Sequence, residues 1–101
     1  MPLTIALESE GNQIIRTIES HGILDPYLSE PTLSECILLK YIDLYGDTLF
    51  NHLQMSDLIQ DLLKLTQKNN QSQFNHLIDE ILVILRQCLN GVHLYIRFIG
   101  D

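Results

Sequence analysis

Alternating apolar and polar positions predict a strand at the end of the chain and a hairpin near its start. Residues 92–99 alternate over their whole length, with one face formed by Val92, Leu94, Ile96 and Phe98 and the other by His93, Tyr95 and Arg97. This period of two is typical of a half-buried strand. Residues 3–8 and 13–19 carry similar patterns and are separated by Gly11 and Asn12, which tolerate the positive φ of a turn.

The middle of the chain fits two structures. The aliphatic and aromatic runs 36–43 and 48–51 predict a second hairpin that turns at Tyr45, Gly46 and Asp47. A single helix over residues 34–53 is the alternative, because one helical stripe joins Leu33, Ile37, Leu38, Tyr41 and Leu44. The β-branched and aromatic content favours strands. Residues 20–34 are rich in turn-forming residues and predict a surface loop, tethered by Ile23, Leu24, Tyr27 and Leu28.

Two helices are predicted in the second half of the chain. Ser56 is expected to cap the first, which starts at Asp57. Its apolar stripe contains Met55, Leu58, Ile59, Leu62, Leu63 and Thr66, and its outward face contains Asp57, Gln60, Asp61, Lys64 and Lys68. The second helix runs from a cap at Ser72 to Asn90 and Gly91, which are expected to close it in a left-handed turn. Val83 and Ile84 widen its apolar stripe, so we expect it to be the central element of the core.

These elements predict an α+β fold with the order ββ-loop-ββ-αα-β. The chain of 101 residues is expected to form a single domain over residues 1–101. The most economical packing is a two-layer arrangement, with an antiparallel sheet built from two hairpins and the C-terminal strand and with both antiparallel helices on one face. The pattern leaves the order of the strands open.

Charge narrows the classes of partner. Six Lys and Arg residues stand against 13 Asp and Glu residues, a formal charge of -7, and the cations are scattered. Binding to DNA, RNA or an anionic membrane depends on clustered cations, so we expect neither a nucleic-acid nor a membrane partner. An acidic surface favours a basic protein partner, although the charge also serves solubility. The absence of a signal-peptide pattern and the two widely spaced cysteines, Cys36 and Cys88, favour a cytoplasmic location.

Few residue patterns point to chemistry. The polar face of the last strand carries His93, Tyr95 and Arg97, which together suit an anionic group or a carboxylate, although a solvated sheet face is the simpler explanation. His52 lies with Asn51 and Gln54 where residues 50–54 lead into the first helix; this group can cap the helix or line a pocket. The pairs His76/Glu80 and Asp43/Asp47 are too sparse for a metal site, so no metal or cofactor is expected.

We therefore expect a non-enzymatic interaction protein, because the sequence contains none of the common catalytic motifs. The narrower hypothesis is an inhibitor or immunity-type protein that binds a basic toxin or nuclease. The alternative is a small-ligand-binding or weakly catalytic domain that uses a hollow joining His93, Tyr95 and Arg97 with His52 or Tyr45. A third hypothesis is a homo-oligomer, formed through an exposed sheet edge or through the face of the second helix that carries Val83 and Ile84.

Overall fold

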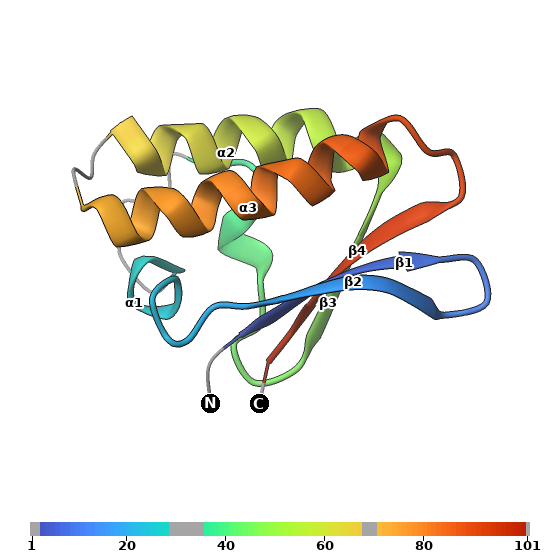
Figure 1. The fold of residues 1–101 in the computed structure, drawn as a ribbon, viewed down its shortest axis with the longest axis horizontal. Helices are drawn as coiled ribbons and strands as arrows, with labels where there is room; N and C mark the ends of the chain where they lie inside the picture. Colours follow the sequence, from blue (N-terminus) through green and yellow to red (C-terminus); the bar gives the residue numbers. More distant parts are fainter. Residues whose placement is uncertain (1–2, 29–35, 68–70, 101) are drawn as a thin grey trace.

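Four antiparallel strands and two long helices form two layers, which confirms the predicted α+β fold (Figure 1). A computed structural model describes residues 3–28, 36–67 and 71–100. The strands are β1 (Thr4–Ser9), β2 (Gln13–Glu19), β3 (Asp47–Asn51) and β4 (Leu94–Ile99). The two long helices are α2 (Met55–Gln67) and α3 (Ser72–Leu89), and both lie on the same side of the sheet. None of the helices in the described parts of the chain is long and apolar enough to cross a bilayer.

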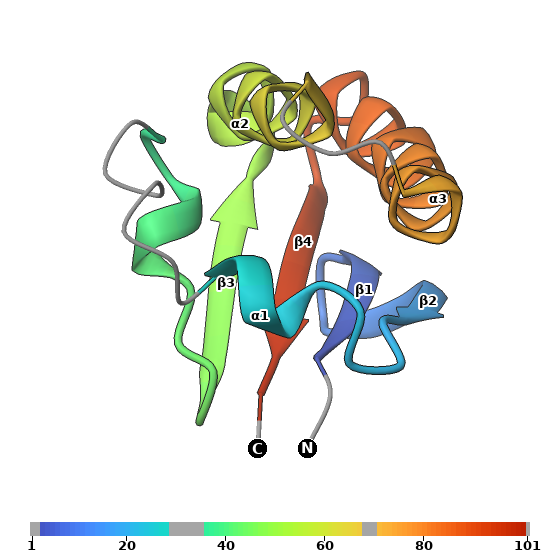
Figure 2. The same cartoon turned by 90° about the vertical axis from the view of Figure 1, so that its left-hand side faces the viewer.

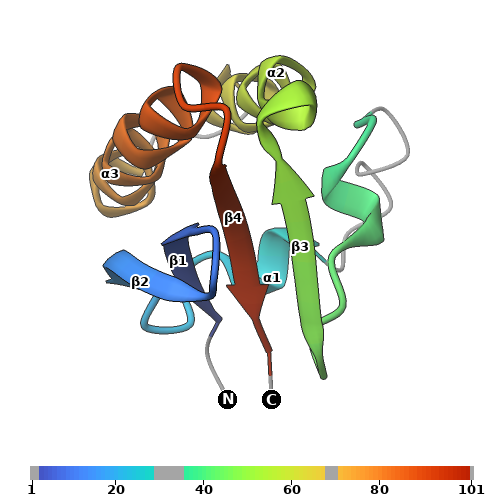
Figure 3. The same cartoon turned by 90° about the vertical axis from the view of Figure 1, so that its right-hand side faces the viewer.

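The C-terminal strand β4 is an inner strand, because the sheet order is β2-β1-β4-β3 (Figure 3). Ile96 and Phe98 point into the core and are fully buried, as the alternation predicts. The strand begins at Leu94 rather than at Val92, since residues 91–93 turn the chain out of α3. Its outer-face residues therefore have neighbours on both sides, from β1 and from β3.

The N-terminal hairpin is confirmed, with Gly11 at φ 83° and Asn12 at φ 63° in its turn. Its second strand, β2, forms one edge of the sheet. The pairing with β1 shifts between Leu7 and Glu8, so β2 carries an extra residue at this point. Such a bulge increases the local twist of an edge strand.

The prediction of a second hairpin is wrong, and so is the alternative prediction of a helix over residues 34–53. In the described part, residues 36–46 form no strand, and Leu39–Tyr41 is one 3-10 turn, η2. The strand β3 pairs with β4 instead. The reason is Asp61 of α2, whose carboxylate accepts the backbone N–H groups of residues 37, 38 and 39 at 3.0, 2.7 and 3.1 Å. Asp61 was expected to face solvent, but it is fully buried.

The loop over residues 20–34 contains a short helix, α1 (Asp25–Leu28), and its residues 29–34 lie outside the described residues. Leu24 and Leu28 are buried, and the Tyr27 ring lies 4.3 Å from that of Phe74 on α3. The predicted tether is thus confirmed for these residues. It holds the loop beneath the start of α3, where α1 is seen in Figure 1.

Both predicted caps at Ser56 and Ser72 are wrong. Asn51 caps a 3-10 turn, η3 (His52–Gln54), which leads directly into α2. Its side chain accepts the N–H of Leu53, while Gln54 accepts the N–H of Asn51, so the pair satisfies two backbone donors. The interpretation of residues 50–54 as a capping group is therefore confirmed. Ser72 is the first residue of α3, and its N-cap is Gln71.

The left-handed end predicted for α3 is also wrong, because neither Asn90 nor Gly91 has a positive φ. Position 91 is crowded, since an added Cβ would lie 2.5 Å from Cδ1 of Leu94 and would require that side chain to shift. The core between the layers is centred on α3, which contributes eight buried residues to it. Of the two residues that widen its stripe, Ile84 is buried and Val83 is exposed.

Candidate functional site

The candidate site lies on the face of the sheet opposite α2 and α3, where Tyr95 and Arg97 project from β4. The register places Arg97 between Ala6 of β1 and Leu49 of β3. Because diagonal neighbours on one sheet face are within reach of long side chains, a carboxylate on each adjacent strand can meet the guanidinium.

Arg97 is held by two carboxylates. Its Nε donates to Glu8 Oε2 at 2.8 Å, and its Nη1 donates to Asp47 Oδ2 at 3.3 Å. The Glu8 side chain is 6% exposed, that of Arg97 is 25% exposed, and that of Asp47 is 50% exposed. The hydrogen bond with Glu8 is the main cause that raises the pKa of Arg97 above its ordinary value. An anionic ligand would have to displace these two partners, so this face is poorly suited to anions.

A hollow of about 330 Å³ opens beside this ion pair, at the turn of the N-terminal hairpin. Its lining joins Tyr95 and Arg97 with Leu49, with the carboxylates Glu8 and Glu10 and with the turn residues Ser9, Gly11 and Asn12. His93 lies at the rim, with its Nδ1 3.0 Å from Glu10 Oε1. The exposed carboxylate of Glu10, a phenol and a turn therefore line the hollow, and its cation, Arg97, is already neutralised by Glu8 and Asp47. This chemistry suits a cationic guest.

The structure does not join all five predicted site residues in this hollow. Tyr95 and Arg97 line it, and His93 reaches it through Glu10. Tyr45 is exposed in the turn before β3, and His52 begins η3; neither lines the hollow. The Nδ1 atom of His52 is buried and has no hydrogen-bond partner among the described residues.

Glu8 and Glu10 are the site residues that the sequence analysis missed. Glu8 follows Thr4 and Ala6 at every second position and alternates with the apolar Ile5 and Leu7, a pattern that places it on the face of β1 away from the core. This position in the alternating pattern was a signal from which Glu8 could have been assigned to the outer face of the sheet. The pairing of β1 with β4, which brings Glu8 to Arg97, was not available from the local pattern.

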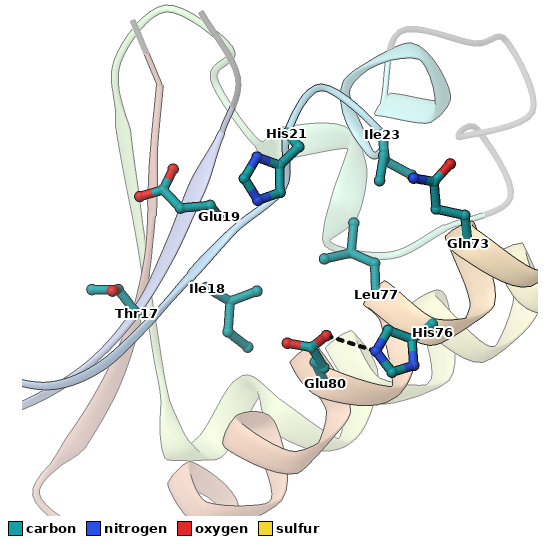
Figure 4. Close-up of a pocket in the computed structure, with 9 residues that line it drawn as sticks. All are labelled: Thr17, Ile18, Glu19, His21, Ile23, Gln73, His76, Leu77 and Glu80. Atoms are coloured by element: carbon teal, nitrogen blue, oxygen red, sulfur yellow. Dashed lines mark ion pairs between the residues drawn. The ribbon is translucent and has the colours of Figure 1, made fainter.

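A second hollow, of about 410 Å³, lies between β2 and the first half of α3 (Figure 4). It contains the pair His76 and Glu80, whose Nε2 and Oε1 atoms are 3.1 Å apart, with Glu19 and His21 opposite. Among the residues that the structure describes, no three His, Cys, Asp or Glu side chains are grouped so as to hold a metal ion. The two histidines therefore line a mixed polar and apolar surface, and the geometry provides no metal centre there.

The cysteines offer no exposed nucleophile. Cys36 and Cys88 are both buried and free of disulfides. The Cys88 thiol lies 3.3 Å from the carbonyl oxygen of Leu94, and burial raises its pKa to about 11. Cys88 is therefore a neutral thiol at physiological pH and a poor nucleophile.

Comparisons with protein-family models, with curated proteins and with solved structures found no match to this chain. The geometry of the hollow beside Tyr95 is therefore the feature from which a function can be argued.

Proposed function

We propose that this protein is a non-enzymatic interaction domain that binds a basic protein through the open face of its sheet. The observation that carries the proposal is the hollow beside Tyr95, which Glu8 and Glu10 face. Arg97, the one cation among the described residues that line it, is already paired with Glu8 and Asp47. A lysine or arginine side chain of the partner is the guest that fits this charge distribution.

The individual groups support a cationic side chain. The Glu10 carboxylate is exposed at the rim and offers a charge-assisted hydrogen bond. The Tyr95 ring provides a surface for a cation–π contact, which is worth about 0.5–2 kcal/mol. The formal charge of -7 attracts a basic partner over a longer range and raises the rate of association.

The narrower form of the proposal is an inhibitor or immunity-type protein that covers the active surface of a basic toxin or nuclease. A surface that binds nucleic acid is itself basic, so it is complementary to an acidic domain. A cytoplasmic location is part of the proposal and is supported by two buried cysteines that form no disulfide, which is typical of reducing compartments.

A small-ligand site is the second candidate, favoured by the volume of the same hollow. About 330 Å³ is near the lower end of the range for small-molecule sites, about 300–1,000 Å³. Because Arg97 is already paired with Glu8, the ligand expected for this candidate is a small cation, such as a polyamine, rather than an anion. A partner protein is favoured because the hollow lies on an open sheet face rather than in an enclosed cavity.

The proposal is tested by affinity capture from the source cells with three forms of the protein. Glu10→Lys reverses a charge at the hollow, and Asp79→Lys makes the same change in net charge on the exposed side of α3. We expect the wild type and Asp79→Lys to capture the same basic protein, and Glu10→Lys to lose it. Raised salt should weaken the capture, because the contact is electrostatic.

Equal capture by both variants would refute the proposed face, and capture that does not depend on salt would refute the acidic mechanism. A polyamine titration of the wild type distinguishes the second candidate, a small-ligand site, from the protein-binding function. Saturable binding of spermidine at Tyr95, without a captured protein, would favour the small-ligand function.

A further inference from the structure

We propose that the outer groove between α2 and α3 binds an acidic amphipathic helix of a second protein. The groove lies on the opposite layer from the sheet site and prefers the opposite charge. This binding function is therefore independent of the proposed one. Figure 2 shows the two helices side by side, seen nearly end-on above the sheet.

The groove is built from two neighbouring hollows. The larger, of about 500 Å³, is lined by Ile59 and Leu63 of α2 and by Arg86 and Leu89 of α3, with neutral polar residues between them. The smaller, of about 280 Å³, is lined by α2 alone: it shares Gln60 and Leu63 with the first and continues along that helix to Lys64 and Gln67. Together they follow α2 for more than two turns, and the larger one also reaches α3.

Apolar side chains are exposed along this groove. Leu63 and Leu89, which line the larger hollow, are each 39% exposed. Ile59 and Leu63 are spaced i,i+4 and form one ridge of α2. An apolar groove between two helices is the surface into which an amphipathic helix packs with residues at i, i+3 or i+4, and i+7.

Charge identifies the kind of helix. The chain has 13 acidic and six basic residues, yet the charged side chains that line the two hollows are Arg86 and Lys64. The Arg86 side chain makes no ion pair or hydrogen bond with a described residue, whereas Arg97 on the sheet is paired twice. Acidic residues beside the apolar face of a bound helix would complement this unpaired guanidinium.

A second copy of the chain is a poorer occupant. Two copies packed groove to groove about a two-fold axis would bring the cations of both copies together, and like charges across an interface are unfavourable. The occupant is therefore a different protein with an acidic helix.

The test uses a defined probe, a synthetic peptide of about 18 residues with leucines at i, i+3, i+4 and i+7 and glutamates flanking them. The full-length protein is titrated with it while the NMR signals of the Leu63 and Leu89 methyl groups are followed. We expect saturable shifts at these methyl groups. A second peptide with lysine in place of each glutamate should bind there at least about ten-fold more weakly.

Two charge-reversal variants supply the matched comparison. Arg86→Glu should weaken the binding of the acidic peptide about ten-fold, whereas Arg16→Glu, the same change on the exposed edge strand β2, should alter it less than about two-fold. Circular dichroism verifies that both variants remain folded. Glu10→Lys, which disrupts the sheet site, should leave the methyl response unchanged, so failure of one site is distinguishable from failure of the other.

Three results would overturn the inference. The first is the absence of saturation at the Leu63 and Leu89 methyl groups. The second is equal weakening by Arg86→Glu and Arg16→Glu, which would show a general charge effect. The third is a dimer in light scattering that Leu63→Asp dissociates, because a second copy would then occupy the groove.

Discussion

The two ion pairs of Arg97 should differ in strength, because the same guanidinium contacts one buried and one exposed carboxylate. Glu8 is almost fully buried and accepts from Nε at 2.8 Å, whereas Asp47 is half exposed and accepts from Nη1 at 3.3 Å. The perturbation is a pair of double-mutant cycles built from Glu8→Gln, Asp47→Asn and Arg97→Met. Methionine keeps much of the apolar stem and removes the charge.

The magnitudes follow from burial. A hydrogen bond between charged, largely desolvated groups contributes about 1.5–3 kcal/mol, so the coupling energy of Glu8 with Arg97 should be about 2 kcal/mol. Solvent screens the contact with Asp47, whose coupling should be about 0.5 kcal/mol. Arg97→Met alone should cost about 3 kcal/mol, because it leaves the Glu8 charge buried without a partner.

Urea unfolding followed by circular dichroism gives the free energy of unfolding of each variant. A Glu8 coupling below about 0.5 kcal/mol, or one smaller than that of Asp47, would refute the reasoning. Arg97 would then be a loosely held cation, and the hollow beside Tyr95 would suit an anion instead.

Three further changes test other contacts by the same assay. Asp61→Asn removes one carboxylate acceptor for the amides of residues 37–39 and should cost about 2 kcal/mol, whereas the exposed Asp57→Asn should cost much less; equal costs would contradict the assigned role. Asn51→Ala removes the cap of η3 and should cost about 1 kcal/mol, and no measurable loss would show that the cap is dispensable. Burial raises the pKa of Cys88 from 9.0 to about 11, so its protonated thiol stabilises the fold fully below pH 9 and loses that contribution between pH 9 and 11. Over this range the wild type should lose about 2–3 kcal/mol more than Cys88→Ala, and parallel pH profiles would contradict the assignment.

Local periodicity predicted the elements whose burial follows from their own sequence. The alternation in β4 identified Ile96 and Phe98 as core residues, and the turn at Gly11 and Asn12 identified the hairpin. The prediction for residues 36–46 was wrong because their apolar run is compatible with both a strand and a helix. The deciding group is Asp61, 22 to 24 residues away in sequence. A charged side chain at this position of the helix suggested a carboxylate that faces solvent, so the burial of Asp61 could not be predicted from the local sequence pattern.

The candidate site was predictable on one strand only. The alternation placed Tyr95 and Arg97 on one face of β4, and the structure keeps them together. Their charge environment depends on which strands flank β4, and that order comes from non-local pairing. The pairing with β1 and β3 turns a pattern that suggested an anion site into one that suits a cation.

The central claim, that the hollow beside Tyr95 receives a cationic side chain, is tested most directly by an NMR titration with a short lysine- and arginine-containing peptide. Backbone amide shifts of the ¹⁵N-labelled protein report which residues the peptide contacts. The account predicts saturable shifts concentrated at Glu10, Gly11, Asn12 and Tyr95, and their loss in Glu10→Lys but not in Asp79→Lys. Shifts spread evenly over the acidic surface, or unchanged by Glu10→Lys, would contradict it.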